Sequence, residues 1–153
     1  MELEFAKKTA AELMAELAPC TKKMEVVGSI RRQRPSVNDI DLLVIPSNQG
    51  LLDTKLRELG CQFGGPKIRR LVYKGALVDI YIAGDDTWAM LLLVRTGSTA
   101  HNKQLAIRAK RLGLHFAADG RGILQDNKPI AYRSEEEIFA ALGLPYIEPH
   151  MRE

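Results

Sequence analysis

The stretch from Val26 to Pro46, VVGSIRRQRPSVNDIDLLVIP, constrains this chain more than any other. An apolar run ends at a Gly-Ser pair, arginines follow, and Asp39 and Asp41 then open a second apolar run. Because residues i and i+2 of a strand project from the same face, the two aspartates are expected to stand side by side. Like charges so close repel each other unless a cation lies between them. The stretch therefore predicts a carboxylate pair for a hard divalent cation such as Mg²⁺.

The residues just before the aspartates predict a phosphate site. Gly28 lets the backbone approach an anion closely, Ser29 offers a hydroxyl, and Arg32 is one of three arginines whose planar guanidinium groups match phosphate oxygens. A metal pair and a triphosphate site on one hairpin indicate nucleotidyl transfer. The alternative is that Asp39 and Asp41 flank a turn and the arginines form a solvated face, because a D-x-D motif is weak by itself.

A third carboxylate stands in the middle of a later apolar run, ALVDIYIA. A charged side chain inside a buried strand is costly unless it is paired or bound to a metal. Asp79 is therefore expected to complete a triad of metal ligands. The alternative places Asp79 on the wet face of an edge strand, where one polar residue costs little.

Length and composition fit a globular protein of one domain or two very small ones, with 153 residues, 46% hydrophobic and 27% charged. The longest apolar run, near Met90, is too short to span a membrane, and the acidic, amphipathic amino end is unlike a signal peptide. Cys20 and Cys61 lack the spacing of a zinc site or a disulfide framework. We therefore expect a cytoplasmic protein, nucleoid-associated or viral, with no membrane partner.

The net charge of +3 permits nucleic-acid binding without requiring it, so the distribution of charge is more informative than the sum. Two groups of basic residues lie close in sequence to the proposed catalytic segments, although most charge runs are solvated faces. The first basic cluster comprises Lys67, Arg69, Arg70 and Lys74, and the second comprises Lys103, Arg108, Lys110 and Arg111.

Periodicity predicts helices and strands in alternation, and a capping box at Ser134 predicts the start of a last helix. Residues 114–130, with Gly113 just before them and Gly120 and Gly122 within them, are expected to hold a small hairpin. The expected helices cover 2–17, 51–59, 88–93, 98–112 and 138–142, and the expected strands cover 24–27, 40–45, 68–73 and 76–82.

The motifs G-S-x-R-R, D-x-D, V-D-I, T-G-S-x-x-x-N and S-E-E-E-I-F-x-x-L-G-L-P-Y-I-x-P occur in this order. Together they resemble the palm and thumb of family X DNA polymerases, in the nucleotidyltransferase superfamily that includes DNA polymerase β. The resemblance covers essentially the whole chain. It implies an α+β fold, with a nucleotidyltransferase palm of mixed or antiparallel sheet and packed helices at 1–94. A small α/β thumb-like subdomain that binds nucleotide and DNA is implied at 95–153.

The resemblance also implies an activity. Family X polymerases add deoxynucleoside monophosphates from dNTPs to a primer 3′-hydroxyl by two-metal-ion catalysis. Asp39, Asp41 and Asp79 are implied to be both the catalytic residues and the ligands of two Mg²⁺ ions, which Mn²⁺ can replace. The implied partners are a dNTP and DNA, as primer-template or gapped duplex, bound by a monomer. The implied role is short-gap filling in DNA repair.

Residues that bind the substrate are implied motif by motif. The G-S-x-R-R motif is implied to hold the β- and γ-phosphates through Ser29 and Arg32. The T-G-S-x-x-x-N motif is implied to place Gly97 and Ser98 against the incoming sugar and Asn102 at the base edge. The full set implied to contact the substrate is Gly28, Ser29, Arg32, Asn38, Gly97, Ser98, Asn102 and Lys103.

The chain departs from the family pattern at several places. Asn38 stands where a small residue usually precedes the first aspartate, and Val94-Arg95 replaces the usual aromatic pair before T-G-S. Ala106 stands where many members have an arginine that touches the template. The lyase and helix-hairpin-helix modules that usually open these polymerases are not expected in this chain, so lyase activity and a full grip on a gap are not expected either.

Two other functions stay open from the sequence. One is a template-independent nucleotidyltransferase that acts on RNA ends, a protein or a small molecule. The other is a catalytically silent DNA-binding protein built on the same palm. The thumb-like segment and the closing motif argue against the first, and the presence of all three carboxylates argues against the second.

Overall fold

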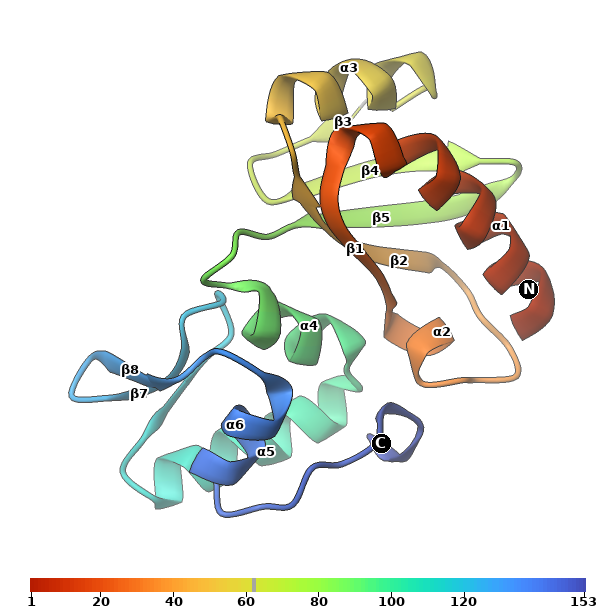
Figure 1. Ribbon diagram of the computed structural model, residues 1–153. Helices are drawn as coiled ribbons and strands as arrows, with labels where there is room; N and C mark the ends of the chain where they lie inside the picture. Colours follow the sequence, from red (N-terminus) through yellow and green to blue (C-terminus); the bar gives the residue numbers. More distant parts are fainter. Residues whose placement is uncertain (62) are drawn as a thin grey trace. The chain divides into compact units, whose positions relative to one another are not determined.

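The computed structural model describes residues 1–61 and 63–153, and it divides into two compact units. Unit 1 comprises residues 1–83 and unit 2 comprises residues 84–153 (Figure 1).

Helix α4 (Trp88–Thr96) belongs to unit 2, whereas the sequence placed most of this segment in the first domain, 1–94. Packing explains the difference, because the inward residues of α4 are part of the buried core of unit 2. These residues are Ala89, Met90 and Leu93.

A five-stranded sheet forms the centre of unit 1, in the order β1-β2-β5-β4-β3 (Figure 1). Strands β2 and β5 run parallel, and the other neighbours run antiparallel. The predicted mixed sheet and the predicted antiparallel pairing of β1 with β2 are confirmed, while the parallel pairing adds a neighbour that periodicity did not predict. The strands are β1 (Thr21–Val27), β2 (Ile40–Pro46), β3 (Phe63–Gly64), β4 (Ile68–Tyr73) and β5 (Ala76–Ile82).

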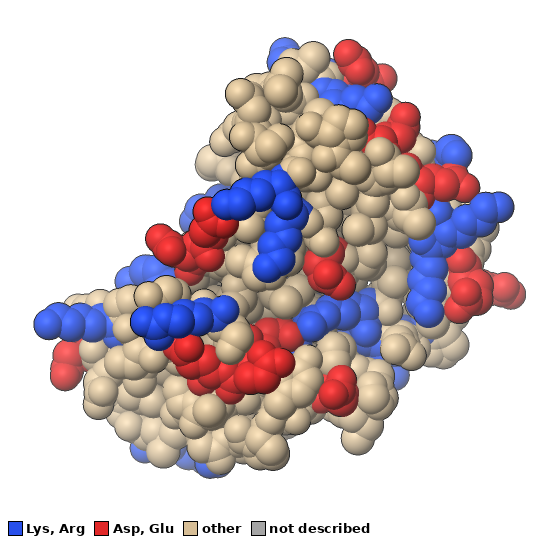
Figure 2. Space-filling view, in the orientation of Figure 1, with Lys and Arg blue, Asp and Glu red and all other residues tan. Residues whose placement is uncertain are grey.

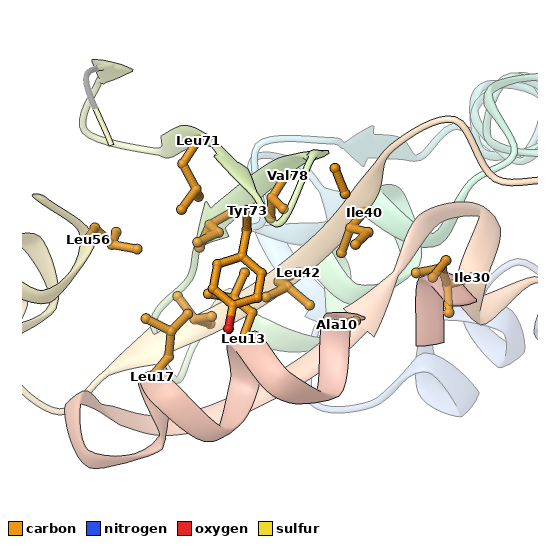
Figure 3. Packing of buried hydrophobic residues seen from close by; sticks show 14 of the residues in the cluster. Ala10, Leu13, Leu17, Ile30, Ile40, Leu42, Leu56, Leu71, Tyr73 and Val78 are labelled. Carbon is orange, nitrogen blue, oxygen red and sulfur yellow. The ribbon is translucent and has the colours of Figure 1, made fainter. Parts of the chain in front are cut away.

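Helix α1 (Leu3–Leu17) covers one face of this sheet with an apolar stripe, as its helical period predicts. Figure 3 shows Leu13 of this helix beside Tyr73 and Leu42 of the sheet, all three in one buried cluster. The fully buried residues of the stripe are Ala6, Ala10, Leu13 and Leu17.

Two shorter helices complete unit 1 with the 3-10 turn η1 (Ala18–Cys20). Helix α3 (Gln49–Glu58) is capped by Asn48, whose side chain accepts a hydrogen bond from the Leu51 amide at 3.0 Å. Helix α2 (Gly28–Arg31) was not predicted, because a single turn is too short to show a period.

Strand alternation decides which side chains face away from the helices. In β5, Ala76, Val78 and Ile80 join the core beneath the helices, so Leu77 and Asp79 point to the opposite face. The same alternation turns Arg70 of β4 toward that opposite face. The face that carries the predicted carboxylates is therefore the one that α1 leaves open.

Unit 2 packs helices around a three-stranded antiparallel sheet of order β6-β7-β8, where the sequence predicted a hairpin. Gly122 makes the extra pairing possible: its φ is +102°, and a Cβ there would overlap the carbonyl oxygen of Ala131. The elements after α4 are α5 (Thr99–Arg111), β6 (His115–Ala117), β7 (Gly122–Gln125), β8 (Lys128–Ala131), α6 (Glu135–Ala141) and the 3-10 turn η2 (Pro149–Met151).

The predicted capping box is confirmed, since the Ser134 hydroxyl accepts a hydrogen bond from the Glu137 amide at 3.0 Å. Helix α6 accordingly begins at Glu135, three residues before the predicted start. Within the ranges that the structure describes, no helix is both long enough and apolar enough to cross a bilayer.

Candidate active site

Two of the three predicted carboxylates occupy paired positions on neighbouring strands. Asp41 of β2 is the register partner of Asp79 of β5, and these strands are parallel. Partners in adjacent strands project from the same face about 4.8 Å apart. Asp39 immediately precedes β2 and is half-buried. The sheet thus brings Asp41 and Asp79 together, while Asp39 lies at the entrance of β2 rather than within it.

Arg70 supplies a positive charge to this face. It is the register partner of Asp79 on the other side of β5, and its Nε donates to the Asp79 Oδ1 at 2.8 Å. The Asp79 residue is only 8% exposed, so this ion pair offsets the cost of burying its carboxylate. The expectation that a buried aspartate needs a cation is met here by a guanidinium.

The donor set suits a hard divalent cation, since all three predicted ligands are carboxylates. In the described parts of the chain, however, no three His, Cys, Asp or Glu side chains converge as a group that could hold a metal ion. Asp41 and Asp79 fit such a site in placement and chemistry. For Asp39 to act as the third ligand, its side chain must move. The Asp79 oxygen that accepts a hydrogen bond from Arg70 must give up this contact to bind a metal ion.

The turn before α2 lies directly against Asp41. Val27, the last residue of β1, is the register partner of Asp41, and Gly28 follows with a φ of +63°. A Cβ on Gly28 would overlap the Oδ2 of Asp41. Only glycine therefore allows both the left-handed backbone and the close approach to the carboxylate. Ser29 follows in α2 and is half-buried.

Arg32 is the residue that follows α2, and the charges of Arg34 and Asp41 both act on it. Burial lowers the pKa of its guanidinium, the charge of Arg34 lowers it further, and the carboxylate of Asp41 opposes the shift. A phosphate beside Arg32 would relieve the charge repulsion, which suits the predicted phosphate site. Asn38, by contrast, is exposed on the segment that leads into Asp39.

The remaining predicted residues gather in unit 2, where α4 gives way to α5. The Ser98 hydroxyl caps α5 by accepting from the His101 amide at 3.1 Å, and Gly97 is buried. Asn102 Nδ2 donates to the Val94 carbonyl at 2.8 Å, so the Asn102 side chain fastens the end of α4 to the start of α5. Lys103 is exposed one residue later.

Members of both basic clusters make internal contacts, the first cluster through Arg69, Arg70 and Lys74 and the second through Arg108. In the first, Arg69 is buried and its Nε donates to Asp53 at 2.9 Å, Arg70 pairs with Asp79, and Lys74 pairs with Glu12. On the face that Figure 2 shows, basic and acidic side chains are accordingly interspersed.

In the second cluster, Arg108 acts as a structural contact. Its Nε donates to the Leu142 carbonyl, and its Nη2 to the Gly143 carbonyl at 3.5 Å, so it satisfies acceptors at the carboxyl end of α6. Lys103, Lys110 and Arg111 remain exposed on α5. These three side chains of the second cluster are accessible to a nucleic acid.

The sequence did not predict the burial of three ionisable residues in unit 2: His101, Glu135 and Arg152. The ring of His101 packs 6.1 Å from that of Phe139, centroid to centroid. Glu135 and Arg152 form an ion pair at 2.7 Å. The capping box explains an acidic residue at 135, but nothing in the spacing of the carboxyl-terminal segment predicts that an arginine there is buried.

His101 gives unit 2 a dependence on pH. Burial lowers the pKa of its imidazole below the usual 6.5, and the charge of Arg152 lowers it further. The unfolded chain therefore takes up the proton first, so stability is complete above about pH 6.5 and falls at lower pH. We expect the thermal midpoint to drop by a few degrees between about pH 7.5 and 5.5, and to drop less in His101→Leu. Exposed His115, changed to Gln, is the control; an unchanged pH profile in His101→Leu contradicts the assignment.

Comparisons with known proteins found similarities that extend over both units. The family model for the DNA polymerase beta thumb matches residues 91–153. The chain is also similar to the DNA polymerase/3′-5′ exonuclease PolX of Bacillus subtilis, with 26% identity over 164 aligned residues. That alignment covers 97% of this chain but 28% of the relative, so the chain spans little more than a quarter of that protein's length.

Among solved structures, the chain is similar to Leishmania infantum polymerase beta in a ternary P/T complex, with a TM-score of 0.85. The match covers 100% of this chain and 76% of the other at 19% sequence identity. At that identity the likeness is one of fold, and it extends over unit 1 and unit 2 alike.

Proposed function

From its family X DNA polymerase-like fold, we propose that this chain is a DNA polymerase that adds deoxynucleoside monophosphates from dNTPs to a primer 3′-hydroxyl. The observation that carries the proposal is the pairing of Asp41 with Asp79, with the Gly28 turn packed against Asp41. This geometry joins a carboxylate pair to the turn that we propose binds phosphate. Unit 1 would act as the palm and unit 2 as the thumb.

The chemistry would be in-line attack of the hydroxyl on the α-phosphate, with pyrophosphate leaving. Asp39, Asp41 and Asp79 would hold two Mg²⁺ or Mn²⁺ ions, which lower the pKa of the hydroxyl and offset charge on the leaving group when bound. A carboxylate oxygen of Asp79 would accept the hydroxyl proton. Because Arg70 contacts Oδ1 of Asp79, this role requires the Arg70 contact to loosen or the other oxygen to act.

The rest of the proposed site positions the nucleotide. Ser29, Arg32 and the Gly28 amide would hold the β- and γ-phosphates. Gly97 and Ser98 would lie against the sugar. Asn102 is proposed to contact the base edge, and the exposed residues Asn38 and Lys103 are proposed to contact the substrate.

The hydrogen bonding of the Asn102 side-chain amide supports this assignment. Its Nδ2 is held by the Val94 carbonyl, while its Oδ1 is buried and accepts no hydrogen bond from any described residue. A buried acceptor without a donor is costly, and a base edge would supply the donor if the Asn102 side chain moved to expose this oxygen. We propose that the monomer works on primer-template or gapped DNA in short-gap repair.

Incorporation of labelled dNTPs on gapped, nicked and single-stranded DNA, with Mg²⁺ or Mn²⁺, tests the proposal. We expect extension that follows the template and is fastest on the gapped duplex. Addition that ignores the template would support a template-independent transferase instead. Binding to DNA without incorporation on any substrate would identify a silent DNA-binding protein and refute the proposed activity.

A further inference from the structure

The Arg152 side chain is fully buried near the end of the described chain, with 0% exposure. Its Nε donates to the Ile147 carbonyl at 2.8 Å, and its Nη1 donates to the Glu135 Oε2 at 2.7 Å. The guanidinium also lies over two aromatic rings, 5.1 Å from the centre of Phe139 and 5.3 Å from that of Tyr146. Two of the three guanidinium nitrogens therefore have acceptors and two rings contact the group, while Nη2 is buried without a hydrogen-bond partner among the described residues. These contacts together fix the side chain in one position.

Glu135, the partner of Arg152, is itself held in place. It is the first residue of α6, where a negative charge is favoured, and it is 5% exposed. Its other oxygen accepts a hydrogen bond from the Tyr146 hydroxyl at 3.4 Å. A buried ion pair contributes little net stability compared with apolar residues, but it penalises every arrangement that separates the two charges. The pair therefore defines where the carboxyl-terminal segment lies on α6.

The backbone of Arg152 connects this fixed segment to the proposed nucleotide site. Its carbonyl accepts a hydrogen bond from the Ser98 amide at 3.1 Å. Ser98 in turn caps α5 through the His101 amide, and the preceding Thr96 and Gly97 are buried. The Gly97–Ser98 turn, which joins α4 to α5, is thus held on one side by its own helix and on the other by Arg152.

We propose that Arg152 is a positioning residue for the nucleotide: its buried side chain fixes the backbone carbonyl that holds the Gly97–Ser98 turn. This inference rests on the proposed function, which places the turn against the sugar. Arg152 touches no substrate in this scheme. Loosening the turn removes binding that is equal in the ground and transition states, so it raises KM for the dNTP and leaves kcat nearly unchanged.

Arg152→Met tests the inference, because methionine fills much of the same space and donates no hydrogen bond. Ile138→Ala is the matched control: Ile138 is fully buried in the same core, and its side chain makes no hydrogen bond. We expect the KM for dNTP to rise about tenfold in Arg152→Met, with kcat within about threefold, at equal distance below each variant's thermal midpoint. Equal KM values in the two variants overturn the inference.

Amide hydrogen exchange gives a second result that does not depend on activity. The Ser98 amide should exchange about tenfold faster in Arg152→Met than in Ile138→Ala, because it loses a fixed acceptor. The exchange rate of the Ser98 amide in Arg152→Lys should lie between the rates in those two variants. An ammonium group can pair with Glu135 but cannot also donate to the Ile147 carbonyl as the planar guanidinium does. If Arg152→Met does not fold, Arg152→Lys carries the comparison, and protection equal to that of the natural protein overturns the inference.

The two experiments separate this inference from the proposed function. A natural protein that incorporates no nucleotide refutes the polymerase proposal, while the exchange of Ser98 still decides whether Arg152 holds the turn. An active natural protein whose Arg152→Met variant keeps both its KM and its Ser98 protection refutes the positioning role alone.

Discussion

Replacing Asp41 or Asp79 by asparagine is expected to lower nucleotide incorporation by about a thousandfold or more, because each change removes a charged ligand that the transition state needs. Asparagine keeps the shape of the side chain, so the fold should persist. Asp79→Asn also loses its charge pair with Arg70, but the Arg70 side chain is 56% exposed and such pairs contribute little to stability. Single-turnover incorporation and thermal unfolding measure the two effects.

Asp53→Asn is the control for this prediction. Asp53 also pairs with an arginine of β4, Arg69, but on the helix-covered side of the sheet. Its loss should reduce stability modestly and leave the incorporation rate within about threefold of the natural value. Near-natural rates in Asp41→Asn or Asp79→Asn would show that the carboxylates are not catalytic, whatever the control does.

Gly28→Ala should reduce both stability and nucleotide incorporation, although it removes no functional group. The new Cβ would both strain a backbone at φ +63° and overlap the Oδ2 of Asp41. We expect a loss of about 1–3 kcal/mol in the free energy of unfolding. Displacing the carboxylate should reduce incorporation by about a hundredfold or more.

Gly75→Ala is the control, because it introduces backbone strain without a steric overlap. Gly75 has a φ of +81°, but a Cβ there would meet nothing within 4 Å. This variant should lose about 1–2 kcal/mol of stability and keep its incorporation rate. Equal rates for the two alanine variants would mean that the contact between Gly28 and Asp41 does not matter for activity.

Local sequence signals predicted much of unit 1. The strands expected at 68–73 and 76–82 have those bounds in the structure, because alternating residues flank Lys74-Gly75, and both turn residues adopt positive φ. The pairing of β1 with β2 followed in the same way from adjacent runs. The α+β class and the family X-like fold were also predicted correctly, the latter from motif order rather than periodicity.

Contacts between distant segments account for what the sequence did not predict. The first basic cluster lies close in sequence to the proposed catalytic segments, but Arg69, Arg70 and Lys74 pair with acidic residues on other elements of unit 1. No pattern in the sequence predicts the burial of Arg152, which contacts Glu135 and Phe139 of α6. Periodicity reports the environment along one element, so it cannot show that a charge is matched across elements.

The parallel pairing of β2 with β5 affects how the proposed site forms during folding. Hairpin β1-β2 carries the Gly28 turn with Asp41, and hairpin β4-β5 carries Arg70 with Asp79; each can pair locally. Joining them requires closing the long loop through α3, which costs chain entropy before any contact compensates for it. A chain that forms the two hairpins but does not pair β2 with β5 therefore contains Asp41 and Asp79 without bringing them together. Incorporation activity would then report the completion of folding more sharply than helix content does.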